Sequence, residues 1–237
     1  MIRTTDDGDL RVVTIDRPGR RNALRPTDLE ALGDTVEATD APVVLLRGSG
    51  AAFCAGADLD SVASLDSDAD LPDPEAFARL GQRVANTIEA SDSVVVAGID
   101  GAARGGGVEL ALACDVRVAT SRATLGEPGV RLGLFGAWGG TVRLPRIVGE
   151  GHALEFSLSG RVVDADEALR MGLVSRIVDD PREVAASMAD NDHQSLRIIK
   201  KRLRDRGPDD EQFEDEAAGF AELHRANVDD IAASREE

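Results

Sequence analysis

A run of three glycines followed closely by a carboxylate is the first candidate for chemistry in this chain. Residues 101–109 read GAARGGGVE, and a single residue separates the last glycine from Glu109. Glycines allow a backbone to approach a ligand closely, and the start of a helix offers unpaired N–H groups and a positive dipole end. Such N–H groups stabilise a developing oxyanion in a dry site, beside which Glu109 would move a proton. The alternative is a tight turn with a surface glutamate, because a glycine triplet alone is weak evidence.

The elements around this stretch are those that such a site needs. Residues 93–99 form an apolar run typical of a short buried strand, and residues 110–115 predict an almost wholly apolar helix. A second glycine stretch, residues 48–59, follows the strand predicted at 42–47. Within it Gly56 lies between two alanines, so its backbone is bare and suits N–H groups that face a ligand. The alternative for this stretch is a plain glycine-rich loop.

The rest of the chain alternates short strands with helices. In the loop 16–26, Arg17, Arg20 and Arg21 suit either phosphate contacts or solvent, and the polar, acidic segment 60–73 predicts a mobile loop. Asp164 is expected to cap a helix that Gly172 ends. Residues 125–140 predict a long turn region that contains the only tryptophan. Periodicity predicts further strands at 10–15, 116–119 and 174–178, and helices at 27–39, 74–90, 141–148, 151–158, 165–171 and, with breaks near 191 and 207, from 181 onward.

Composition excludes several classes of protein. The 237 residues contain no apolar run of transmembrane length and no secretory signal at the start, which predicts a cytoplasmic protein. The three histidines have no metal-binding spacing, and Cys54 and Cys114 are expected to be buried thiols rather than a disulfide or metal pair. The net charge of −17 disfavours binding to nucleic acid and to anionic membranes.

The acidic charge also has an unusual composition. Asp outnumbers Glu by 28 to 16, and there are 25 arginines but only two lysines, Lys200 and Lys201. The acidic residues are spread over the whole chain. We interpret this as adaptation to a salty cytoplasm, in which salt screens the repulsion between the charges of a hydrated acidic surface.

Several segments together resemble the crotonase, or enoyl-CoA hydratase/isomerase, superfamily. The matching segments, which cover most of the chain in the order and at roughly the spacing of the family, are DRPGRRNAL (16–24), AAFCAGADL (51–59), GAARGGGVELALACD (101–115), LGEPGVRLGLFGAWGGTVRLPRIVG (125–149) and SGRVVDADEALRMGLVSRIV (159–178). The resemblance implies an α/β fold, a spiral of repeated β-β-α turns with a helical C-terminal region. It divides the chain into a core at 1–180 and a helical region at 181–237 for trimerisation or covering the pocket. It also implies a homotrimer or a dimer of trimers.

The resemblance further implies an acyl-CoA thioester as substrate. By motif position, Ala57 and Gly106 would donate the two backbone N–H groups that stabilise an enolate at the thioester oxygen. The turn around Ala55 and Asp58 would face the adenine of coenzyme A. The substrate-binding residues that the resemblance implies are Arg21, Ala23, Ala55, Asp58, Leu59, Gly105, Pro128 and Gly129.

The expected ligand contacts of Arg20 and of the two lysines have weaker support. Arg20 would lie near the pantetheine and phosphate path with Arg21 and Ala23, whereas Lys200 or Lys201 would contact a phosphate on the argument of charge alone. Neither a metal nor a separate cofactor is expected, because coenzyme A is part of the substrate.

The acid/base residues depart from the family pattern. Glu109 matches the first of the two glutamates that serve hydratases in the family, and the second should follow Pro128. That position is Gly129, while Glu127 lies two residues early. On an extended segment Glu127 would point to the same face as Gly129, one pleat away. Glu127 is therefore either a substitute for the missing acid or, as is more common for such a residue, an acidic side chain of a loop or of a contact between subunits.

The implied activity is therefore that of an enoyl-CoA hydratase/isomerase, with an oxyanion-stabilised enolate and Glu109 as acid/base. Double-bond migration needs only one carboxylate and is the natural candidate. Alternatives are decarboxylation, thioester hydrolysis or a non-catalytic acyl-CoA-binding homologue, because the second glutamate is missing at Gly129. RNA binding, which some relatives show, is disfavoured by the charge of −17.

Overall fold

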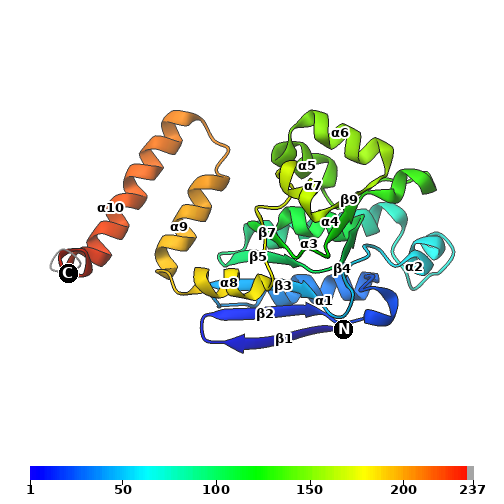
Figure 1. Cartoon of the computed structure of the whole chain (residues 1–237), viewed down its shortest axis with the longest axis horizontal. Coiled ribbons are helices and arrows are strands. Elements are labelled where there is room, and N and C mark those ends of the chain that lie inside the picture. Colours follow the sequence, from blue (N-terminus) through cyan, green and yellow to red (C-terminus); the bar gives the residue numbers. More distant parts are fainter. Residues whose placement is uncertain (234–237) are drawn as a thin grey trace.

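Two sheets, with helices packed around them, form the body of the protein (Figure 1). The structure is a computed structural model and describes residues 1–233. The larger sheet has the order β1-β2-β3-β5-β7-β10, with β1 (Ile2–Asp7), β2 (Leu10–Ile15), β3 (Val43–Gly48), β5 (Val94–Ile99), β7 (Val116–Ala119) and β10 (Arg176–Ile177). The smaller sheet has the order β4-β6-β8-β9, with β4 (Ala52–Cys54), β6 (Ala102–Arg104), β8 (Thr124–Gly126) and β9 (Val162–Asp164).

Three passes of the chain each contribute one strand to each sheet and are followed by a helix. β3 leads into β4, β5 into β6, and β7 into β8, and within each sheet these strands are parallel. The pairs β1–β2 and β8–β9 are antiparallel. Parallel strands need a crossover connection, which the helices supply. This is the spiral of strand–strand–helix turns that the family resemblance implies.

The helices that surround the sheets agree closely with the predicted periodicity. They are α1 (Pro26–Glu37), α2 (Leu59–Ser64), α3 (Pro74–Ala90), α4 (Gly106–Ala113), α5 (Gly140–Val148), α6 (Glu150–Ser159), α7 (Ala165–Arg170), α8 (Pro181–Ala189), α9 (His193–Arg204) and α10 (Asp209–Ala233), with two short 3-10 helices, η1 (Pro18–Arg20) and η2 (Pro128–Leu132). As predicted, Asp164 caps α7 by accepting from the N–H of Glu167, and Gly172 follows its end at φ +76°.

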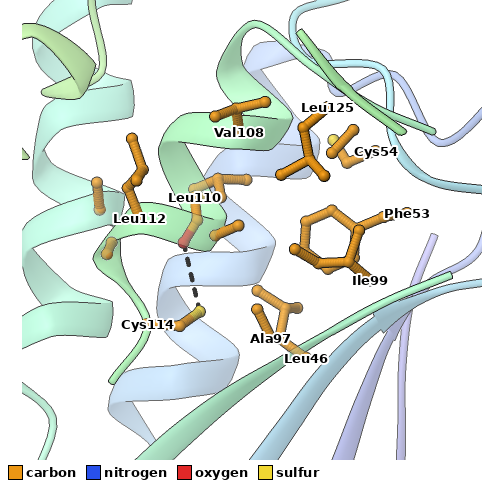
Figure 2. Packing of buried hydrophobic residues seen from close by; sticks show 14 of the residues in the cluster. Leu46, Phe53, Cys54, Ala97, Ile99, Val108, Leu110, Leu112, Cys114 and Leu125 are labelled. Atoms are coloured by element: carbon orange, nitrogen blue, oxygen red, sulfur yellow. Dashed lines mark hydrogen bonds between the residues drawn. The ribbon is translucent and has the colours of Figure 1, made fainter. Parts of the chain in front are cut away.

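α4 is the central helix, and every one of its residues is buried. Figure 2 shows Val108 and Leu110 of this helix in the same apolar cluster as Phe53, Ile99 and Leu125 from the strands. A helix that is apolar on all sides is stable only when it is packed on all sides. The core therefore fixes the first turn of α4, where Glu109 lies.

Three local expectations need correction. Residues 60–73 are not simply a loop, because α2 begins at Leu59, where the side chain of Asp58 caps it. β1, which the sequence analysis does not assign, pairs with β2 as an antiparallel hairpin. The turn region after residue 125 contains β8 and η2, so the segment from Glu127 to Gly129 is not extended.

The C-terminal helices begin and end where the sequence predicts. α8 packs on the face of the larger sheet opposite to α4, where Val184 and Ala185 join a second cluster with Val43 and Val96. α9 and α10 lie side by side at one end of the molecule (Figure 1). The division into a core and a C-terminal unit near residue 180 stays a prediction. None of the helices within residues 1–233 combines the length and apolar character needed to cross a membrane.

Candidate functional site

The carboxyl group of Glu109 is held in a buried clamp of two backbone amides. Glu109 lies in the first turn of α4 and is 1% exposed. Its Oε1 accepts hydrogen bonds from the N–H of Trp138, at 2.8 Å, and from the N–H of Gly140, at 2.7 Å. Gly136 covers the same carboxyl group so closely that a Cβ there would lie 2.8 Å from its Cδ. The loop before α5 thus fixes the carboxyl group and leaves it no room to rotate.

This environment tunes the proton affinity of Glu109. Burial raises the pKa of Glu109 to about 7, although the amides of Gly140 and Trp138 and the charge of Arg143 favour the ionised form. A carboxyl group with this pKa exists in both forms near neutral pH. Glu109 therefore suits both the acceptance and the return of a proton.

Each of the three glycines before Glu109 has its own structural reason. Gly105 precedes α4 with φ +49°, a left-handed conformation that favours glycine. A Cβ on Gly106 would lie 2.2 Å from the ring of Trp138, and one on Gly107 would lie 2.1 Å from the carbonyl oxygen of Cys54. The triplet lets the helix start pack directly against Trp138 and against β4.

Two backbone N–H groups are available close to this helix start. Leu24 donates to the carbonyl of Gly56, at 2.8 Å, and accepts from the N–H of Asp58, at 2.9 Å. Because these two neighbours of Ala57 make both bonds of the parallel bridge, the N–H of Ala57 itself points away from Leu24. Gly106 is the first residue of α4, so its N–H has no partner within the helix.

The segments that carry these two N–H groups touch. Gly56 has φ +83°, and a Cβ on it would lie 2.8 Å from the nitrogen of Gly106 and 2.6 Å from the carbonyl oxygen of Arg104. The two glycine stretches that the sequence singles out are therefore brought together in space. Their assigned roles as oxyanion donors stay predictions.

The loop that precedes Leu24 is anchored by a buried asparagine that the sequence analysis does not single out. Asn22 is fully buried at φ +60°. Its side chain accepts from the N–H of Arg17, at 2.9 Å, and donates to the carbonyls of Ser49 and Ala52, at 2.9 and 2.7 Å. Asparagine tolerates this left-handed conformation better than most residues, and an asparagine three residues after a Pro-Gly pair is the signal that could have revealed it.

Asp58 has a structural task of its own. It is buried, and its Oδ1 accepts from the N–H groups of Asp60 and Ser61 at the start of α2. Its Oδ2 accepts from Arg17 at 2.6 Å. These contacts keep the pKa of Asp58 below its usual range despite the opposing effect of its burial. Both oxygens are thus used within the chain, and the side chain holds the turn in place.

Four of the remaining predicted residues lie in or directly beside this turn and the loop that it contacts. Ala55 donates to the carbonyl of Arg21 at 3.0 Å, while Ala23 is half-buried and the side chains of Arg21 and Leu59 are exposed. Lys200 does not join them. It lies on α9 in a buried ion pair with Asp115 at 2.8 Å, so its charge is already used within the chain. The phosphate contact of Lys200 or Lys201 stays a prediction.

Glu127 and Gly129, which follow the smaller sheet, differ in burial and in local structure. Glu127 directly follows β8, is buried, and its Oε2 has no hydrogen-bond partner. Pro128 and Gly129 are half-buried and belong to η2. Glu127 lines a small pocket of about 40 Å³ together with Gly136 and Gly140, two of the residues that contact Glu109.

Both cysteines belong to the apolar core. Cys54 and Cys114 are free and buried, as predicted, and burial raises the pKa of each thiol to about 12. Within the described part of the chain, no group of three or more His, Cys, Asp or Glu side chains could hold a metal ion.

Arg143 holds the loop whose N–H groups form this clamp. Its guanidinium donates to Glu89 at 2.7 Å, to Asn86 at 2.6 Å and to the carbonyl oxygen of Trp138 at 3.3 Å. It therefore ties α5 to α3 and holds the peptide that lies between the two whose N–H groups donate to Glu109.

Arg143→Met should shift the acidic limb of the pH–rate profile to higher pH. Removing this cation disfavours the ionised form of Glu109, so the pKa of Glu109 rises and a higher pH is needed to ionise it. The measurement is kcat/KM against pH. Arg146→Met, an exposed site on the same helix, is the matched control and should leave the limb in place. An unshifted limb in Arg143→Met would contradict the coupling.

Comparison with known proteins identifies the family. The model of the family described as enoyl-CoA hydratase/isomerase matches residues 6–228. The crotonyl-CoA hydratase of Syntrophomonas wolfei is 42% identical over 74% of this chain and 67% of its own length. The short-chain-enoyl-CoA hydratase of Clostridium acetobutylicum is 34% identical over 83% and 78%, respectively.

Solved structures agree with this. The enoyl-CoA hydratase of Bacillus anthracis superposes with a TM-score of 0.89 at 28% identity, covering 99% of this chain and 96% of its own. The enoyl-CoA hydratase of Thermoplasma volcanium has a TM-score of 0.88 at 30% identity over the same shares. The chain therefore belongs to the enoyl-CoA hydratase/isomerase family and is an enzyme of that type.

Proposed function

We propose that this protein adds water across the double bond of a short-chain 2-enoyl-CoA thioester. The observation that carries the proposal is the buried carboxyl group of Glu109, clamped beside the start of α4. Relatives named crotonyl-CoA hydratase and short-chain-enoyl-CoA hydratase support the choice of reaction and of a short acyl chain. The reaction needs no separate cofactor, because coenzyme A is part of the substrate.

In this proposal the thioester oxygen accepts hydrogen bonds from the N–H groups of Ala57 and Gly106. Negative charge develops on that oxygen as the double-bond electrons move toward the carbonyl carbon. Fixed N–H donors in a dry site stabilise this charge without reorganising during the reaction. Glu109, ionised at the start, takes a proton from the attacking water.

The coenzyme A end of the substrate would meet a positive site at the mouth of the turn. Arg104 is half-buried, and burial together with the nearby charge of Arg21 lowers its pKa. Within residues 1–233, neither guanidinium has a carboxylate partner. Two close cations without counterions favour the binding of a phosphate group, which both can contact.

Double-bond migration in a 3-enoyl-CoA is the second candidate. Gly129 stands where the family pattern places its second glutamate, and moving a double bond requires only one group that removes and returns the proton. Decarboxylation, thioester hydrolysis and non-catalytic acyl-CoA binding stay as further alternatives.

The assembly and the working conditions are part of the proposal. A homotrimer or a dimer of trimers would cover apolar side chains that the single chain leaves exposed, among them Leu158, Phe213 and Phe220. The charge of −17 supports work in a salty cytoplasm.

A paired assay tests the proposed reaction. The purified protein is incubated at low and at molar salt with crotonyl-CoA, for hydration, and with a 3-enoyl-CoA, for isomerisation. We expect hydration to be the faster reaction and molar salt to sustain it. Isomerisation without hydration would favour the second candidate. If the protein binds the thioester but converts neither substrate, the proposal is contradicted.

A further inference from the structure

Glu127 is the buried group in this region that the mechanism above leaves unused. We propose that Glu127 is the second carboxyl group of the site and delivers the proton to C2 of the substrate, in place of the glutamate missing at Gly129. The inference rests on the proposed hydration, and it assigns the step that Glu109 alone does not complete.

The backbone carries Glu127 directly to the glycine triplet. Gly126, the last residue of β8, accepts a hydrogen bond from the N–H of Gly105 at 3.0 Å. The next residue along the chain is therefore held beside the turn that opens α4. Glu109 lies in the first turn of that helix, so two different elements bring the two glutamates into the same region.

The side chain of Glu127 is aimed into the site rather than to solvent. Glu127 is 8% exposed, and its Oε2 is buried with no hydrogen-bond partner. An unpaired buried polar atom costs free energy, and such atoms in folded proteins call for a functional or structural explanation. A reacting substrate or its water would supply the missing partner.

The space that Glu127 faces adjoins the carboxyl group of Glu109. Glu127 lines its pocket with Gly136 and Gly140. A Cβ on either glycine would lie 2.8 Å from an atom of the Glu109 carboxyl group, so two residues that line the pocket of Glu127 also adjoin that carboxyl group. The other walls include the apolar side chains of Val130 and Leu144, which suit a short acyl group.

A side chain at position 129 would be tightly packed against the backbone that follows it. Gly129 lies in η2, and its carbonyl accepts from the N–H of Leu134 at 2.9 Å. A Cβ on Gly129 would lie 3.1 Å from the carbonyl oxygen of Leu134 and 3.3 Å from the Cα of Phe135. A side chain there would press on this backbone, whereas Glu127 enters the site from the strand end.

The electrostatics give the two carboxyl groups different roles. Glu109 accepts two backbone hydrogen bonds, which stabilise its ionised form, whereas Oε2 of Glu127 accepts none. Burial, and then the charge of Glu109, raise the pKa of Glu127 to about 8, against about 7 for Glu109. The pair therefore holds a proton at neutral pH, and Glu127 is the member that keeps it.

The reaction then balances with these two groups. The water oxygen forms a bond to C3, one of its protons passes to Glu109, and the C2–C3 π electrons move to give the enolate oxyanion. The enolate collapses as C2 takes the proton of Glu127 and the thioester carbonyl is restored. One hydrogen of water remains on the new hydroxyl group, and transfer of the other from Glu109 to Glu127 returns the pair to its starting state.

The test is Glu127→Gln, which keeps the shape of the side chain and removes its transferable proton. We expect kcat for crotonyl-CoA hydration to fall by about 10²–10⁴-fold, the contribution of a positioned acid. The Kd for butyryl-CoA, a saturated thioester that cannot be hydrated, should stay unchanged. Glu127→Ala, which removes the carboxyl group altogether, should show the same loss and serves if the first variant does not fold.

The matched control is Glu30→Gln, an exposed glutamate on α1, which should hydrate at the wild-type rate. If the wild-type protein hydrates crotonyl-CoA and the Glu127 variants do so within a few-fold, the inference is overturned and the proposed function stands. If the wild-type protein binds the thioester but never hydrates it, the proposed function itself fails, and the role of Glu127 fails with it.

Discussion

Glu109→Gln should lower the turnover of crotonyl-CoA by about 10²–10⁴-fold while leaving the Kd for butyryl-CoA unchanged. The amide oxygen of glutamine can still accept the hydrogen bonds of Trp138 and Gly140, so the clamp keeps its geometry. What the variant loses is the group that takes the proton of water. An interaction needed only for the chemical step lowers kcat and kcat/KM together.

Stopped-flow hydration and titration with butyryl-CoA, carried out on one preparation, measure both quantities. Glu30→Gln again controls for the loss of one surface charge. Circular dichroism and thermal unfolding should show an intact fold. Full activity in Glu109→Gln would remove this residue from the mechanism, whereas a loss confined to binding would make it a ligand-positioning group.

Gly56→Ala should lower kcat/KM by about 10²–10³-fold, the effect of losing one oxyanion donor. The added Cβ would lie 2.6 Å from the carbonyl oxygen of Arg104 and 2.8 Å from the nitrogen of Gly106, at a φ of +83° that alanine rarely adopts. One or both of the touching segments must move. The N–H groups of Ala57 and Gly106 would then no longer converge on one oxygen.

Steady-state kinetics with crotonyl-CoA measure this loss, and urea unfolding separates it from a general loss of fold. The matched control is Gly151→Ala on α6, where no atom lies within 4 Å of the added Cβ. That variant should hydrate normally. Wild-type kcat/KM in Gly56→Ala would show that the precise approach of these two segments does not govern catalysis.

Much of the local structure follows from the sequence because short-range rules decide it. The breaks between α8, α9 and α10 fall near Asn191 and Gly207 as predicted, since clustered polar residues and the Gly207-Pro208 pair interrupt the helical pattern there. The placement of Glu109 in the first turn of a buried helix follows likewise from an apolar run after glycines. The exceptions are equally local. α2 escapes prediction because its only strong signal is the single cap Asp58.

The sequence by itself determined most strands and helices and the two glycine stretches, because periodicity and glycine spacing are properties of neighbouring residues. Its resemblance to the family implied the spiral fold and the one matching glutamate. Only the tertiary structure decided what surrounds them. The clamp joins Glu109 to residues 29 and 31 positions away, and Asn22 ties its loop to carbonyls 27 and 30 positions away. Lys200 pairs with a distant carboxylate, and Glu127 lines a pocket with Gly136 and Gly140, which adjoin Glu109. Such contacts depend on how separate elements pack, and no local pattern specifies that packing.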